Sequence, residues 1–236
     1  MKLCVLSSGS QNGNCFVVCA GPMKILIDCG ISPRAIRHKL RFLGIEDGGW
    51  RGAFLTHGHT DHCQYASEFW LATGVTPQRL EEREIRQFVS DGQTLSVTAY
   101  DCPHGETSSA VYRVVDPITG WSVMVATDLT GMTDEAKSVA DSSSIIALES
   151  NYDPLLLEAC GRDEKLKARS RDSHLSNQAA AGLSFRFRKC RELVLVHLSR
   201  QCNSPELVRQ AFDLHWLDGT RITVAWEDPV MVAVGE

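Results

Sequence analysis

The sequence has no long apolar run, no linker-like tract and no internal repeat. None of its 236 residues lie in a run that approaches the roughly 20 apolar residues of a membrane-spanning helix, so we expect no membrane span. The amino-terminal apolar run is too short for a signal peptide, which predicts a cytoplasmic protein. Since no Pro/Ser-rich linker or low-complexity tract divides the chain, a single domain is expected over residues 1–236.

The sequence also lacks a C-x-x-C pair. Its nine cysteines are an odd number and are scattered along the chain, which is not typical of a disulfide framework. Most of them lie in apolar runs, where a reduced cysteine behaves as a small hydrophobic residue. Cys63 and Cys102 stand beside candidate metal ligands and are the two exceptions.

Positive charge is not in excess. A net charge of −5 gives no general attraction to nucleic acid. Two local basic clusters differ from this average, at residues 162–171 and 186–191, and they flank His174. Such a run is either a solvated face or a contact for a phosphate backbone, and the position of both clusters near His174 favours the contact.

Short apolar or alternating runs bounded by Gly, Pro, Asn or Asp recur along the chain and predict strands. These runs are Lys2–Leu6, Cys15–Ala20, Lys24–Asp28, Ala53–Thr56, Thr94–Tyr100, Ser109–Val115, Ser122–Ala126, Ser144–Glu149, Glu192–His197, Arg221–Ala225 and Val230–Val234. Helices are predicted at Pro33–Leu43, Pro77–Val89, Asn177–Lys189 and Pro205–Trp216. Strands precede helices in each half, which predicts two packed sheets with helices outside them.

One short segment, Thr56-His57-Gly58-His59-Thr60-Asp61-His62, concentrates metal-ligating side chains. Three imidazoles and a carboxylate so close together are costly to bury unless a metal binds them. The first two histidines alternate by two positions, whereas Asp61 and His62 come one turn later and face another direction, which suits two neighbouring metal ions. Gly58 permits backbone torsions closed to other residues. A His-rich surface loop is the alternative interpretation.

Four other predicted strands end where a ligand-type residue begins a loop. A single Asp or His at a strand end is more often a cap or turn residue. Four of them, in a chain that also carries the His57 segment, indicate one shared site. The four segments are Asp101-Cys102-Pro103-His104-Gly105, Thr127-Asp128, Glu149-Ser150-Asn151 and His197-Leu198-Ser199.

In these motifs the chain resembles the metallo-β-lactamase-fold hydrolases, and among them the YycJ/WalJ-like group. The His57 segment is typical of the superfamily, and an amino-terminal Ser-Gly-Ser loop with two His-Leu-Ser segments is typical of the group. The matching motifs run from residue 3 to residue 203. Besides the His57 segment they are Ser7-Ser8-Gly9-Ser10-x-x-Gly13-Asn14, Leu26-Ile27-Asp28-Cys29-Gly30, Thr127-Asp128, Glu149-Ser150-Asn151, His174-Leu175-Ser176-Asn177 and His197-Leu198-Ser199-x-x-Cys202-Asn203.

The resemblance implies an α/β (α+β) fold, an αββα four-layer sandwich of two mixed sheets flanked by helices. It implies a dinuclear metal-dependent hydrolase with two divalent ions, zinc first and manganese or iron as alternatives, for which imidazole and carboxylate ligands are suited. Asp28 is expected to orient one ligand imidazole. By matching position, the ligands of the first metal are His57, His59 and His104, and those of the second are Asp61, His62 and His197, with Asp128 bridging.

The resemblance also implies the chemistry. A hydroxide shared by the two metals would be the nucleophile. Related phosphodiesterases place a histidine beside a carboxylate, and the matching residues are His174 and Glu149, which would protonate the leaving alkoxide; with Asp61 they form the predicted catalytic set. β-Lactam hydrolysis needs no such pair, so phosphodiester chemistry is favoured. A surface position at the start of a helix is the alternative for His174.

The loop at Ser8-Gly9-Ser10 through Asn14 offers hydroxyl, amide and backbone N–H groups that suit a phosphate. We therefore expect Ser8, Ser10 and Asn14, together with Asn177, to bind substrate. A plain β-turn between two strands is the alternative.

The leading hypothesis is a phosphodiesterase acting on nucleic acid, DNA rather than RNA, and by resemblance a 5′-to-3′ DNA exonuclease. A small-molecule hydrolase of the same fold, acting on a cyclic phosphodiester or a thioester, is one alternative. It predicts that basic residues near His174 can be neutralised without loss of activity: Arg169, Arg171, Arg186 and Arg188. A non-enzymatic metal-stabilised module is another, and the complete ligand set argues against it.

Overall fold

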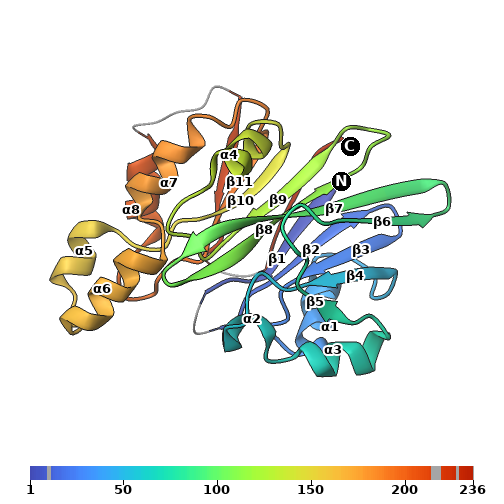
Figure 1. Cartoon of the computed structure of the whole chain (residues 1–236), viewed down its shortest axis with the longest axis horizontal. Coiled ribbons are helices and arrows are strands. Elements are labelled where there is room, and N and C mark those ends of the chain that lie inside the picture. The colour runs from blue at the N-terminus through green and yellow to red at the C-terminus, as the bar shows by residue number, and fades with distance from the viewer. Residues whose placement is uncertain (10–11, 214–218, 227–228, 236) are drawn as a thin grey trace.

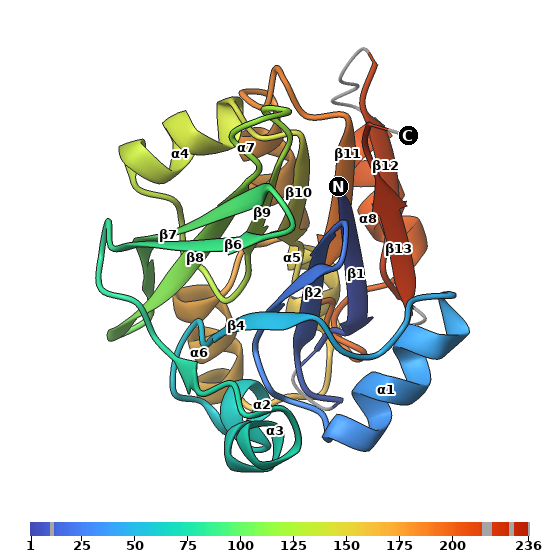
Figure 2. The same cartoon turned by 90° about the vertical axis from the view of Figure 1, so that its right-hand side faces the viewer.

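The computed structural model describes residues 1–9, 12–213, 219–226 and 229–235 as two β-sheets packed face to face, with helices on both outer sides (Figures 1 and 2). No helix among these residues is long and apolar enough to cross a membrane. The expected four-layer αββα arrangement is confirmed.

The first sheet has six strands in the order β13-β1-β2-β3-β4-β5. Antiparallel pairing joins β13, β1, β2 and β3, whereas β3, β4 and β5 are parallel. The helix between β3 and β4 makes that crossover possible. The strands are β1 (Lys2–Ser7), β2 (Cys15–Ala20), β3 (Met23–Ile27), β4 (Trp50–Phe54), β5 (Pro77–Gln78) and β13 (Val230–Ala233).

The second sheet has seven strands in the order β12-β11-β10-β9-β8-β7-β6. The four from β6 to β9 are antiparallel, and the four from β9 to β12 are parallel. The strands are β6 (Ile85–Ser90), β7 (Gln93–His104), β8 (Thr107–Val115), β9 (Ser122–Ala126), β10 (Ile145–Glu149), β11 (Glu192–Val196) and β12 (Arg221–Val224).

Alternation along the strands divides the apolar side chains between layers. In β1, Leu3 and Val5 face the core between the sheets, whereas Cys4 and Leu6 face the helices of the first sheet. Helices α1 and α3 cover that outer face, and α4, α7 and α8 cover the outer face of the second sheet. The helices are α1 (Pro33–Phe42), α2 (Thr60–Cys63), α3 (Ala66–Thr73), α4 (Asp134–Asp141), α5 (Pro154–Ala159), α6 (Glu164–Ser173), α7 (Asn177–Ser184) and α8 (Pro205–Asp213).

The predicted strands all form, with their ends moved by a few residues, but one predicted helix is wrong. Residues 77–89 form β5, a turn and edge strand β6 instead of a helix, because β6 pairs with β7 along its whole length. The helix from Asn177 ends at Ser184 and not at Lys189, and Trp216 lies outside the described residues. Gly58 has a φ outside the left-handed region, so its expected special torsion is not used.

Candidate metal centre

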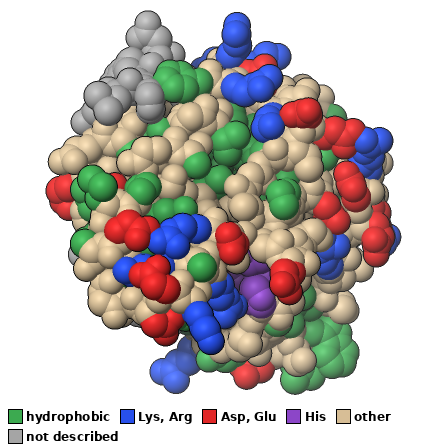
Figure 3. Space-filling view, turned by 60° about the vertical axis from the view of Figure 1, so that its left-hand side comes forward, with side chains coloured by type: hydrophobic (Ala, Val, Ile, Leu, Met, Phe, Trp, Pro, Cys, Tyr) green, Lys and Arg blue, Asp and Glu red, His purple; other side chains and the backbone are tan. Residues whose placement is uncertain are grey.

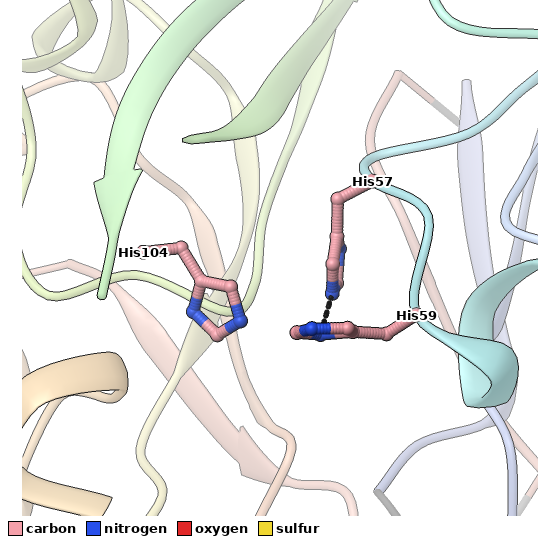
Figure 4. A group of neighbouring side chains, drawn as sticks. All are labelled: His57, His59 and His104. Atoms are coloured by element: carbon pink, nitrogen blue, oxygen red, sulfur yellow. Dashed lines mark hydrogen bonds between the residues drawn. The ribbon is translucent and has the colours of Figure 1, made fainter. Parts of the chain in front are cut away.

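Three histidines converge from two separate segments (Figure 4). His57 and His59 lie in the loop after β4, and His104 is the last residue of β7. His57 Nε2 lies 2.7 Å from His59 Nδ1, and the His57 and His104 ring centroids are 4.9 Å apart. One nitrogen of each ring lies within 4.8 Å of one nitrogen of the others. These three side chains, predicted as one ligand set, are therefore close enough to share an ion.

A second group lies beside the first. Asp61 and His62 are on the short helix α2, and His197 follows β11 of the other sheet. One ligand atom of each again lies within 4.8 Å of the others, and His62 Nε2 is 3.5 Å from Asp61 Oδ2. The structure thus brings the second predicted set together as well, across the gap between the two sheets.

Asp128, just after β9, lies between the two groups. Its Oδ2 atom is 3.2 Å from His62 Nε2 and 3.6 Å from His197 Nε2, and its Oδ1 atom is 3.9 Å from His104 Nε2. A carboxylate that faces imidazoles of both groups has the placement that a bridging ligand needs.

Three of the histidine rings are oriented by acceptors that lie against their Nδ1 atoms. His62 Nδ1 lies 2.7 Å from Asp28 Oδ2, His104 Nδ1 lies 2.7 Å from the Ser173 carbonyl, and His197 Nδ1 lies 2.9 Å from Glu149 Oε1. An acceptor at Nδ1 fixes the tautomer in which Nε2 carries the lone pair that a metal binds. Asp28 thus has the orienting position expected from the sequence.

Thr56 is a contact that the sequence did not reveal. Its hydroxyl lies 3.0 Å from both carboxylate oxygens of Asp28 and from His57 Nδ1. A threonine at the end of a predicted strand has no signal that separates such a role from an ordinary strand residue. It ties the orienting carboxylate to the first histidine of the motif.

The ionisable groups of the cluster differ in the direction in which their pKa values are shifted. Burial, with His62 nearby, lowers the pKa of His57 to about 2. Burial also disfavours a charged His62, but Asp128 and Asp28 outweigh it and raise the pKa of His62 well above its usual value. Burial opposes ionisation of Asp128, whereas His197 and His62 hold its pKa well below the usual range. The packed imidazoles therefore divide into neutral and charged rings around an ionised carboxylate.

A divalent metal fits these donors. His197 Nε2 is buried without a hydrogen-bond partner among the described residues, and it faces Asp128. A buried polar atom left in this way normally signals an unseen partner. The donors are imidazole nitrogens and carboxylate oxygens, a set that suits zinc, manganese or iron.

His174 and Glu149 form the predicted pair. His174 follows the last residue of α6, and its Nδ1 atom lies 2.7 Å from Glu149 Oε1 and 3.8 Å from Asp128 Oδ1. Glu149 is fully buried at the end of β10, where its Oε2 atom accepts from the Leu129 backbone N–H at 2.8 Å. Burial disfavours the carboxylate, but His174 and His197 lower the pKa of Glu149. An ionised carboxylate therefore orients both imidazoles.

Comparison with known proteins shows what this chain resembles in sequence and in fold. The sequence model of the metallo-beta-lactamase superfamily matches residues 9–117. The metallo-β-lactamase-fold protein YhfI of Bacillus subtilis superposes with a TM-score of 0.73 at 12% identity, covering 98% of this chain and 98% of that one. The chain has a metallo-β-lactamase fold. The expected resemblance to this superfamily is confirmed.

Two further relatives of this metallo-β-lactamase fold carry names that describe nucleic-acid enzymes. Exodeoxyribonuclease WalJ of Streptococcus pneumoniae is 24% identical over 231 residues, which is 87% of this chain and 84% of the relative. The short form of human tRNase Z has a TM-score of 0.66 at 16% identity, with 100% of both chains covered.

Three of the four predicted substrate-binding residues lie behind the candidate metal centre and are not among the residues that line its pocket. Asn14 is fully buried, and its side chain contacts Gly9 N, Asp61 and His62. The Ser8 hydroxyl accepts from the His197 backbone N–H at 2.6 Å. Asn177 is buried as well, paired with Asn203 at 2.9 Å. Ser10 lies outside the described residues, and substrate binding by the four stays a prediction.

An open pocket of about 900 Å³ adjoins the metal-ligand cluster, and a second of about 850 Å³ continues past it. Both are lined by His59, His104, Arg169 and Ser173, so they meet over the cluster. Helix α6 forms one wall of both. Figure 3 shows histidine surface at one place on this face, flanked by Lys or Arg and by acidic side chains.

The two adjoining pockets together form a groove over the metal-ligand cluster. Only one of the two basic clusters lines this groove. Arg162 and Arg169 line the first pocket, and Lys165 lines the second. The cluster at 186–191 lies elsewhere: the Arg188 backbone N–H donates to Asp141 at the end of α4, and Arg191 stacks over Trp121 before β9. The expectation that both clusters serve the site was wrong for the second, because that cluster lies toward the opposite ends of the strands.

Proposed function

We propose that this protein is a metal-dependent hydrolase of phosphodiesters in nucleic acid, in DNA rather than RNA, and that it is a 5′-to-3′ exonuclease. The observation that carries the proposal is the hydrogen-bonded pair of His174 and Glu149, 2.7 Å apart, beside the cluster of metal-ligand side chains. Cleavage of a phosphodiester expels an alkoxide that must be protonated, and a positioned imidazole does this well. The resemblance to Exodeoxyribonuclease WalJ supports the choice of DNA.

The residues around the cluster would hold two divalent ions, zinc first and manganese or iron as alternatives. The seven ligands are His57, His59, Asp61, His62, His104, Asp128 and His197. When bound, the ions supply Lewis acidity and a nucleophile at neutral pH.

The acid step belongs to His174. Its Nδ1 atom is engaged by Glu149, so Nε2 is the atom that can donate to a leaving oxygen in the pocket, which His174 lines. The carboxylate of Glu149 fixes the orientation of the ring through this contact at Nδ1. Glu149 itself is fully buried and therefore positions His174 without touching substrate.

The groove on both sides of the cluster supports a polymer substrate. Exposed Arg169 lines both pockets, and its side chain makes no hydrogen bond or ion pair with any residue that the structure describes. Lys165 extends the positive charge along α6. A series of cations along a groove follows the phosphate backbone of a nucleic acid, whatever its sequence.

The acid role is tested by the His174→Ala variant. We expect its rate of DNA hydrolysis to fall by about 10²–10⁴-fold while its metal content is unchanged, because proton donation is lost and the metal ligands remain. The measurement is cleavage of 5′-labelled single- and double-stranded DNA and RNA with added Mn²⁺ or Zn²⁺. His38→Ala, an exposed histidine on α1, is the matched control, and Asp128→Ala should abolish activity. Full activity of His174→Ala would refute the assignment.

The polymer groove is tested separately by Arg169→Ala, with Arg188→Ala as its matched control on the far side. We expect KM for DNA to rise several-fold in Arg169→Ala alone, with a weaker salt dependence, because one phosphate contact is lost. Turnover of bis-p-nitrophenyl phosphate should be the same in both variants, because a small ester does not span the groove. Activity on the small ester without any polymer cleavage would favour a small-molecule phosphodiesterase instead.

A further inference from the structure

Two cysteines meet at the wall of the pocket. Cys160 follows the last residue of α5, and Cys202 lies in the loop between β11 and α8. Their sulfur atoms are 3.3 Å apart, although the residues are separated by 42 positions in the chain. A disulfide requires a sulfur–sulfur distance of about 2.0 Å, so the two atoms would need to approach by on the order of 1 Å.

The two thiols differ in ways that suit stepwise oxidation. Cys202 is fully buried, whereas Cys160 is partly exposed and is the one an oxidant reaches. Burial opposes a thiolate at Cys160, but hydrogen bonds from the Arg162 backbone N–H and from Cys202, with the charge of Arg162, lower the pKa of Cys160. Burial and the neighbouring Cys160 raise the pKa of Cys202. The exposed sulfur is thus the better nucleophile, and the buried one is held beside it.

We propose that Cys160 and Cys202 are a site of oxidative modification, at which a peroxide converts the two thiols into a reversible disulfide. In the first step the Cys160 sulfur attacks the O–O bond of hydrogen peroxide, forms a sulfenic acid and releases water. In the second step the Cys202 sulfur attacks that sulfenic sulfur, an S–S bond replaces the S–O bond, and a second water leaves. The two sulfurs together lose two electrons, and the peroxide gains them.

The disulfide would join two segments of the pocket wall. Residues 161–163 and Gln201 line the pocket directly beside the two cysteines, and Arg162 Nε already donates to Gln201 Oε1 at 2.8 Å. The Cys202 side is fixed, because Asn203 next to it donates to the Ser150 and Asn151 carbonyls. The Cys160 side leads into α6, which ends at Ser173, the residue before His174. A covalent link would therefore anchor the start of the helix that carries His174.

Selectivity distinguishes this pair from the other thiols. Cys4 and Cys19 also hydrogen-bond to each other, but both are buried beneath the helices of the first sheet. Cys63 is partly exposed, but burial raises its pKa, and its sulfur is directed at the carbonyls of Gly58 and His59. We therefore expect peroxide to act first on Cys160.

Peptide mapping of the full-length, zinc-loaded protein tests the proposal, because zinc itself is not redox-active. After treatment with hydrogen peroxide and alkylation of the remaining thiols, trypsin should release the fragment 138–162 joined to the fragment 201–209. Each of these fragments contains a single cysteine, so the cross-link is assigned without ambiguity. We expect this species to account for most of both fragments, and dithiothreitol to reverse it.

Thermal unfolding gives a second readout. Closing a loop of this length should raise Tm by roughly 10 °C on oxidation. Cys160→Ser should show neither the cross-link nor the rise, and the matched control Cys63→Ser should show both. Cys160 recovered as sulfinic acid with Cys202 still alkylated, or cross-links spread over other cysteines, would overturn the proposal. A Tm rise that persists in Cys160→Ser would overturn it too.

Discussion

Three residues of the candidate metal centre share an unusual backbone conformation. Asp28, Asp128 and His197 have φ values of 65°, 57° and 57°, and each lies within two residues of the end of a parallel strand. Asp and His are among the few residues that adopt this left-handed region readily. The bend turns each side chain away from its strand and into the space between the sheets. Ligand-type residues at strand ends could be recognised in the sequence, but the sharp turn that aims them could not.

At the same scale, Asp28→Asn tests how far the orienting acceptors matter. The substitution keeps a residue that tolerates positive φ but removes the charge that faces His62 Nδ1 at 2.7 Å. We expect metal affinity to fall about 10–100-fold, because acceptors behind metal-binding histidines typically contribute that much. Competition with a chelator of known affinity measures the change. Asp47→Asn, whose carboxylate pairs with Arg37 far from the cluster, should bind metal like the unmodified protein. Equal affinity in the two variants would contradict the role of Asp28.

Among the elements, strands were predictable and helices were much less so. Apolar runs bounded by turn residues are local signals, and every predicted strand forms. The charged segment 77–89 imitates a helix, yet it supplies two edge strands because pairing with neighbouring strands overrides local preference. Helix α6 was missed because its only buried side chains are Lys167 and Ser170, which give no apolar stripe. Helix α6, which forms one wall of the groove, could therefore be identified only from the structure.

The backbone segments at Asn14, Gly30 and Asp61 pass so close to one another that no side chain fits between them. Their contact fixes the position of helix α2. A Cβ atom added at Gly30 would lie 2.0 Å from the Asp61 carbonyl oxygen and 2.3 Å from Asn14 N. The same segments are joined by hydrogen bonds from Asn14 N to Asp61 O, and from Gly30 N to Asn14 O, at 2.7 and 2.8 Å. Helix α2, which carries Asp61 and His62, is thus held in position by main-chain contacts that require a glycine at position 30.

Gly30→Ala should therefore destabilise the fold by about 3 kcal/mol or more, because backbone atoms at such distances cannot yield without displacing Asp61. Urea denaturation of the metal-free protein gives the free energy of unfolding. Gly58→Ala is the matched control in the motif itself: a Cβ there meets nothing within 4 Å, and its φ is not in the left-handed region. We expect its stability to change by less than about 0.5 kcal/mol. Similar losses in both variants would show that the crossing does not need a glycine.

At the scale of the whole molecule, the site exists only where the two sheets meet. The first sheet contributes Asp28 and the His57 segment, and the second contributes His104, Asp128 and His197. The sequence identified the members of this set, since each carries a ligand-type side chain after an apolar run. It could not place the basic cluster at 186–191, which is near His174 in the chain but on the far side of the fold. Helix α7 separates the two segments in the chain, so their closeness in the sequence does not bring them together in the fold.

The histidines of the cluster bind protons in the metal-free protein and would bind metal in the loaded protein. We therefore expect both metal affinity and the stability of the fold to depend on pH. In the metal-free protein, the pKa values of His62 and His197 are raised: burial opposes this, and Asp128 outweighs it. A raised pKa in the folded state stabilises it below the unfolded value of about 6.5, and this stabilisation is lost as pH rises through the folded value. Metal binding requires the deprotonated rings, so its contribution grows over the same range. At these two rings, protons and metal therefore compete for the same nitrogen atoms.

We thus expect the Tm difference between zinc-loaded and chelated protein to widen as pH rises from about 6 to about 8. Free zinc at 1,000 times its Kd adds about 4 kcal/mol, or roughly 10 °C for a chain of this size. Scanning fluorimetry with zinc or EDTA at several pH values measures the gap. His62→Gln should reduce it at every pH, because a ligand is lost, whereas His38→Ala on α1 should leave it unchanged. A gap that stays constant or narrows with rising pH would mean that protons and metal do not compete for these rings.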